Sequence, residues 1–120
     1  MKKVLLPALL VLLAVPAFAD AERDPVRKVE PSKVCMINEQ YMNQEQIPVE
    51  IDEKTYYGCC QMCVDRLNTD EKSRFAVDPM TKKKVDKAKA VIGALADGRV
   101  FYFENEKSLA AYNAMLKTQG

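Results

Sequence analysis

Residues 47–68 read IPVEIDEKTYYGCCQMCVDRLN and contain the pattern that decides the fold. Every second residue from Ile47 to Ile51 is apolar, and this period of two is typical of a half-buried strand. A polar turn at 52–54 leads into a second, aromatic strand at 55–58 that ends in glycine. We therefore predict a strand, a turn and a second strand, followed by a helix over about 60–68.

Residues 90–116 repeat this order of elements. An apolar segment at 90–92 precedes Asp97-Gly98, a dipeptide typical of tight turns, and the aromatic run Val100–Phe103 follows the turn. Asn105 then stands at a position suited to a helix N-cap. One face of the predicted helix carries Leu109, Tyr112 and Leu116.

A shift of 45 residues lays the first of these segments on the second without a gap. It places opposite one another Cys35 and Met80, Cys59 and Glu104, and Cys63 and Ser108. The common order of turn, aromatic strand and helix favours an internal duplication whose second copy lacks cysteines. We predict an α+β fold of two small ββα units packed together, at residues 34–75 and 76–120.

Four cysteines carry the candidate chemistry, one in isolation and three within five residues. Residues three or four apart share a helical face with Cβ atoms roughly 5–6 Å apart, whereas a disulfide prefers about 3.8 Å. Two thiolates can each lie about 2.3 Å from a shared ion, so the spacing favours a metal over a disulfide within the cluster. The candidate metal ligands are Cys35, Cys59 and Cys63, with Cys60 as a possible fourth.

Histidine is absent from all 120 residues, which excludes Ser-His-Asp triads, Cys-His dyads and His-ligated metals. A net charge of +1 gives no electrostatic signature for nucleic-acid binding. Thiolates, with the thioethers of Met36 and Met62 nearby in the sequence, suit soft metals rather than magnesium or calcium. We expect Cu(I) or Zn(II), with cadmium and mercury as further candidates.

The segment from Val34 to Tyr112 resembles two tandem domains of the TRASH/YHS family, small heavy-metal-binding modules of treble-clef type. Their pattern is a cysteine, about twenty residues, then an aromatic pair and Cys-x-x-x-Cys opening a helix. Residues 78–80 and 100–103 resemble a second copy without cysteines, and Cys60 is an additional thiol. The resemblance implies thiolate metal binding in the trafficking, resistance or sensing of metals. The matching residues are Cys35, Tyr56, Tyr57, Cys59 and Cys63.

The N-terminal segment has the pattern of an export signal. Two lysines precede an apolar run from Val4 to Ala19 that is short for a membrane span and ends in Ala-x-Ala. We predict a signal peptide at 1–19, cleaved after Ala19, and a periplasmic mature protein without a membrane span. The charged, proline-containing segment 20–33 is predicted to be a flexible leader.

Two other interpretations suit the same cysteines. Four cysteines in a small secreted domain are also typical of disulfides, which would make the chain an interaction or accessory module without metal. Residues 60–63 also have the CxxC spacing of dithiol redox proteins.

We expect binding rather than catalysis, because no nucleophile is paired with a base in the sequence. The expected partners are a metal ion and a periplasmic or membrane metal-handling protein. The lysine-rich stretch 82–89 is expected to be a solvated loop.

Overall fold

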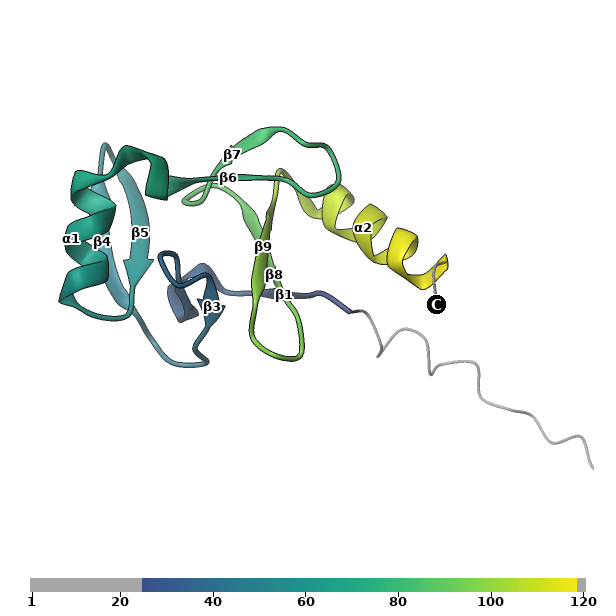
Figure 1. The fold of residues 1–120 in the computed structure, drawn as a ribbon, viewed down its shortest axis with the longest axis horizontal. Helices are drawn as coiled ribbons and strands as arrows, with labels where there is room; N and C mark the ends of the chain where they lie inside the picture. Colours follow the sequence, from purple (N-terminus) through teal and green to yellow (C-terminus); the bar gives the residue numbers. More distant parts are fainter. Residues whose placement is uncertain (1–24, 119–120) are drawn as a thin grey trace, which may run out of the picture.

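Each half of the chain forms an antiparallel hairpin followed by a helix, as the computed structural model of residues 25–118 shows (Figure 1). The predicted signal peptide at 1–19 and the first part of the predicted leader lie outside the described residues. Within residues 25–118, neither helix has the length and apolar character that a membrane crossing requires.

In the first half, β4 (Ile47–Ile51) pairs with β5 (Lys54–Gly58), and α1 (Gln61–Thr69) follows. The register places Val49 opposite Tyr56, and both side chains are buried. Helix α1 packs on both strands. The predicted strand, turn, strand and helix are therefore confirmed.

In the second half, β8 (Val91–Ala94) pairs with β9 (Val100–Phe103), and α2 (Glu106–Thr118) follows. The Asn105 side chain accepts a hydrogen bond from the Ser108 backbone N–H at 2.9 Å, so the predicted cap is confirmed. The predicted apolar face of α2 is only half-buried. Its most buried residues are instead polar, Ser108 and Asn113.

Part of the predicted leader is an ordered strand. β1 (Arg27–Val29) pairs with β8 and completes a sheet of order β1-β8-β9. The Asn113 amide anchors this strand by bonding both the N–H and the carbonyl of the buried Val26. The prediction of a flexible leader is therefore wrong for these residues, because α2 and β8 satisfy their backbone groups.

Short elements link the two halves. A 3-10 turn, η2 (Pro31–Lys33), leads into β2 (Val34–Cys35), which pairs with β3 (Gln40–Tyr41). A second 3-10 turn, η3 (Glu71–Arg74), follows α1. It leads into β6 (Phe75–Val77), which pairs with β7 (Lys84–Asp86).

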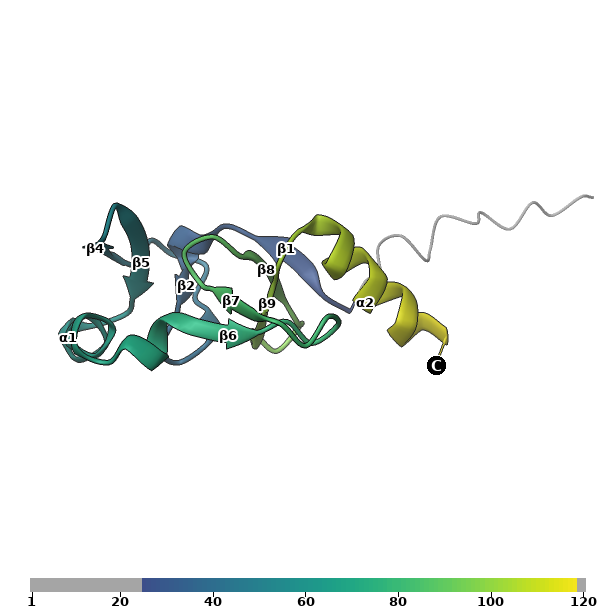
Figure 2. The same cartoon turned by 90° about the horizontal axis from the view of Figure 1, so that it is seen from above.

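The architecture is mixed α+β, with the two helices at opposite ends and the short hairpins between them (Figures 1 and 2). One buried cluster contains side chains from both halves, including Val49, Tyr56, Val85, Ile92 and Tyr102. The two hairpin–helix segments therefore share a core. This shared core fixes the β2–β3 loop, which carries Cys35, against the second half of the chain.

Candidate metal centre

Three thiols from two distant segments converge beside the start of α1. Their sulfur atoms, those of Cys35, Cys59 and Cys63, all lie within 4.8 Å of one another. Cys63 Sγ is 3.8 Å from Cys35 Sγ and 3.6 Å from Cys59 Sγ. The structure therefore brings together the three cysteines that the sequence analysis placed at the site.

Local chain geometry explains this convergence. Cys35 ends β2, Cys59 follows β5 directly, and Cys63 lies in the first turn of α1. Gly58 permits the abrupt passage from strand to helix, because a Cβ atom there would lie only 3.0 Å from Cys63 Cβ. Any larger residue at this position would push the helix start, and Cys63 with it, away from the strand.

The spacing between the sulfurs fits a shared metal ion. Ligands about 2.3 Å from a tetrahedral ion lie about 3.8 Å from each other, close to the two measured separations. All four cysteines are free thiols in the structure. The three-cysteine group is thus close enough to hold a metal, and its all-sulfur donor set suits soft ions.

The loop after Cys35 gives hydrogen bonds to the sulfurs. The backbone N–H of Asn38 donates to Cys35 Sγ and its side-chain amide donates to Cys59 Sγ, both at 3.4 Å. Burial raises the pKa of Cys35, but hydrogen bonds from the backbone N–H groups of Asn38 and Ile37 lower it by more. The pKa of Cys35 therefore lies below its usual value. Such donors stabilise thiolates and orient metal ligands.

The other two thiols of the group have raised pKa values when no metal is bound. Hydrogen bonding to Cys35 is the main cause of the raised pKa of Cys59, and burial is the main cause for Cys63. Three neighbouring thiols do not all ionise easily, because like charges repel. A bound cation would remove this obstacle, and metal binding would release protons.

Cys60 has a different environment from the other three cysteines. It is exposed, occupies the N-cap position of α1, and lies outside the three-cysteine group, although its Sγ is 3.6 Å from Cys63 Sγ. The nearby backbone N–H of Cys63 lowers the pKa of Cys60. Cys60 is thus an accessible thiol at the rim of the cluster.

Lys87 supports the site from the second half of the chain. Its side chain is only 4% exposed, and its ammonium group donates to the carbonyl of Met36 at 2.7 Å and pairs with Glu39 at 3.0 Å. The prediction of a solvated loop over 82–89 is therefore wrong at β7, where Val85 is buried, and at Lys87, which holds the residue after Cys35. Lys89, two residues further on, is exposed as expected.

The two thioethers expected near the cluster have separate locations. Met36 is fully buried in the shared core, whereas Met62 is 79% exposed on α1. The sulfur atoms that the structure places within 4.8 Å of one another are those of three thiols, Cys35, Cys59 and Cys63.

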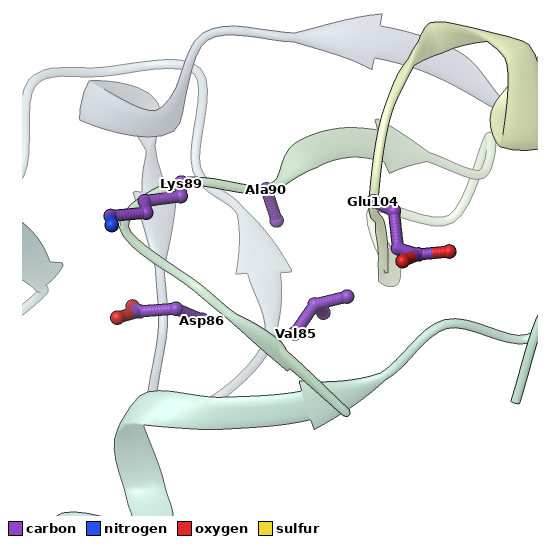
Figure 3. Close-up of a pocket in the computed structure, with 5 residues that line it drawn as sticks. All are labelled: Val85, Asp86, Lys89, Ala90 and Glu104. Carbon is purple, nitrogen blue, oxygen red and sulfur yellow. The ribbon is translucent and has the colours of Figure 1, made fainter. Parts of the chain in front are cut away.

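A hollow of about 200 Å³ lies elsewhere, between β7 and the end of β9 (Figure 3). The Glu104 carboxylate points away from Asp86 and Lys89 in this view. The Asp86 carboxylate is already bonded to Tyr56 and Lys54, each at 2.7 Å. The hollow has no converging set of polar groups comparable with the thiol cluster.

Comparison of the chain with protein families, with curated proteins and with solved structures found no match in any of the three. The geometry of the cysteines therefore carries the functional argument.

Proposed function

We propose that this protein binds a soft metal ion, Zn(II) or Cu(I), through Cys35, Cys59 and Cys63. The observation that carries the proposal is that three thiols from two distant segments lie within 4.8 Å of each other. A tetrahedral ion would take its fourth ligand at the rim of the cluster, where either water or the exposed Cys60, whose Sγ is 3.6 Å from Cys63 Sγ, can fill the position. Three thiolates without Cys60 suit Cu(I).

The proposed role is to carry or scavenge the metal rather than to catalyse a reaction. The N-terminal sequence supports export to the periplasm, an oxidising compartment where a bound metal would protect the thiols. The resemblance of Cys35, Tyr56, Tyr57, Cys59 and Cys63 to the TRASH/YHS pattern supports the same role. On this proposal, each half is a ββα unit of treble-clef type, and only the first holds metal.

The decisive experiment counts reactive thiols in the folded protein, with and without a chelator, alongside native mass spectrometry. A metal site predicts a bound ion and protected thiols that react once the chelator is added. Disulfides predict that thiols become reactive only after reduction, and this result would refute the metal proposal. A dithiol redox protein predicts catalysed disulfide exchange that is lost in Cys60→Ser.

A further inference from the structure

The loop that begins at Asp78 has the same backbone form as the loop that begins at Cys35. In the first loop the Glu39 N–H donates to the Cys35 carbonyl at 2.8 Å, and in the second the Lys82 N–H donates to the Asp78 carbonyl at 2.8 Å. The donor residue has a positive φ in both, 55° at Glu39 and 65° at Lys82. Two non-glycine residues in this uncommon conformation, each four residues after the loop start, mark one loop type.

The flanking strands have the same register. Val34 pairs with Tyr41 beside the first loop, and Val77 pairs with Lys84 beside the second, an offset of 43 residues in both partners. In each loop the first side chain also accepts hydrogen bonds from the backbone that follows it. Cys35 Sγ accepts from one such N–H, and Asp78 Oδ1 accepts from two, at 2.7 and 3.0 Å.

The offset grows along the chain until it reaches the value expected from the sequence. Ile47 pairs with Gly58 and Val91 pairs with Phe103, which gives offsets of 44 and 45 on the two strands of the hairpin. Helices α1 and α2 begin at 61 and 106, again 45 apart. The gap-free shift of 45 is therefore wrong in the loop, where Asp78 rather than Met80 corresponds to Cys35.

When Asp78 is matched with Cys35, each loop contacts the start of its helix through corresponding residues. Cys35 Sγ lies 3.8 Å from Cys63 Sγ in the first half. In the second half Ser108, 45 residues after Cys63, donates its hydroxyl to Asp78 Oδ2 at 2.6 Å. The backbone N–H of Glu104, the counterpart of Cys59, donates to the same oxygen at 2.8 Å.

The Asp78 carboxylate is completely buried, and each of its oxygens accepts two hydrogen bonds. We infer that Asp78 does in the second half what a metal ion does in the first, tying the loop to the start of the following helix. We call the contact between each loop and the start of its helix a joint: 35–39 with 59–64 in the first half, and 78–83 with 104–108 in the second. The second joint is a metal site converted into a metal-free clamp, and thiols at positions 78, 104 and 108 reconstitute a site for a thiophilic ion. The assignment of Asp78 stands on its own contacts, whereas the contrast with the first joint rests on the proposed function.

The consequence is that metal loss loosens only one end of the molecule. Hydrogen exchange on the full chain, loaded with Zn(II) and then treated with a chelator, tests this directly. Exchange is expected to rise at least tenfold at 35–39 and 59–64 and to stay unchanged at 78–83 and 104–108. Equal rises at both joints would overturn the inference.

The Asp78→Asn variant separates this inference from the proposed function. An amide in place of the carboxylate cannot accept all four hydrogen bonds, so exchange is expected to rise at 104–108 with or without metal. A chelator without effect at either joint would refute metal binding while leaving this result intact. Unchanged exchange at 104–108 in Asp78→Asn would overturn the clamp.

A graft tests the conversion itself. The chain with its four native cysteines changed to serine receives Asp78→Cys, Glu104→Cys and Ser108→Cys, with the ungrafted all-serine chain as control. Zn(II) alone is the probe, and native mass spectrometry is expected to show one ion per grafted chain and none on the control. A folded graft that binds no more Zn(II) than the control would contradict the correspondence, and the Asp78→Asn exchange experiment decides the clamp if the graft does not fold.

Discussion

The loop–helix joints of the two halves have similar backbones and opposite chemistry. At the first joint the side chains at the loop start and in the first turn of the helix are two thiols, with their sulfurs 3.8 Å apart. At the second it is a direct hydrogen bond of 2.6 Å between a hydroxyl and a buried carboxylate. The first joint therefore has room for an ion between its groups, whereas the second is already closed by the protein itself.

Removing a proposed ligand should abolish metal binding at the first joint and leave the second joint unchanged. Cys35→Ser or Cys63→Ser is expected to weaken Zn(II) binding by well over ~100-fold. This loss exceeds the one typical of mutating a residue that contacts a metal ligand but not the metal. Competition with a chromophoric chelator measures the loss. Cys60→Ser is the matched control and is expected to cost about tenfold or less, because Cys60 lies outside the three-cysteine group. Equal losses in all three variants would contradict the assigned ligands.

The second joint is tested by removing its carboxylate. Asp78→Ala leaves four donors without their acceptor and is expected to lower the free energy of unfolding by about 3 kcal/mol. Urea denaturation in the presence of a chelator measures this change without any contribution from metal. The exposed Asp97, which bonds mainly to nearby Arg99, gives the control Asp97→Ala, expected to cost within about 0.5 kcal/mol.

Lys87 connects the second half to the first joint, so its loss should affect the metal site from a distance. Lys87→Met removes the bonds to the Met36 carbonyl and to Glu39. It is expected to weaken Zn(II) binding roughly tenfold, as is typical of residues that orient a metal ligand without binding the metal. Lys89→Met, an exposed neighbour, is the control and should leave affinity unchanged. If the two variants bind Zn(II) equally well, Lys87 does not position the Cys35 loop.

The smallest expected effect is a difference in acid sensitivity. Burial raises the pKa of Asp78, but hydrogen bonds from Ser108, Glu104, Thr81 and Met80 lower it more, so the folded pKa is below the unfolded value of about 3.9. The carboxylate therefore contributes stability that is complete above about pH 5 and is lost as the pH falls through the folded pKa.

The melting temperatures of the metal-free wild type and of Asp78→Asn should accordingly differ most near pH 6, and this difference should shrink below about pH 4. Thermal unfolding at a series of pH values, in chelator, measures the two curves. Parallel curves down to pH 3 would show that Asp78 does not titrate with a lowered pKa.

The sequence predicted the hairpin–helix segments well because their signals are local. Alternating apolar residues at 47–51, the polar turn and the glycine before α1 each specify structure within a few residues. The cysteine spacing correctly predicted that Cys59 and Cys63 lie close together. The prediction that they share a helical face is wrong, because Cys59 precedes the N-cap of α1. Cys35 was predicted to join these two cysteines from an earlier segment of the chain, and its Sγ does lie 3.8 Å from Cys63 Sγ.

The features that the sequence did not predict all depend on distant partners. β1 forms because β8, more than 60 residues away, offers its edge. Lys87 is buried because one carbonyl of the Cys35 loop needs a donor, and nothing in a lysine-rich stretch distinguishes it from its neighbours. Asp78 had one usable signal, since aspartate often bonds backbone N–H groups two and three residues on, but its bond to Ser108 required the fold.

The most direct test of a metal at the first joint is X-ray absorption at the zinc edge of the Zn(II)-loaded protein. Three or four sulfur ligands at about 2.3 Å are expected, with the sulfur count reduced by one in Cys35→Ser. A first shell of nitrogen or oxygen alone, or one unchanged by Cys35→Ser, would contradict the account.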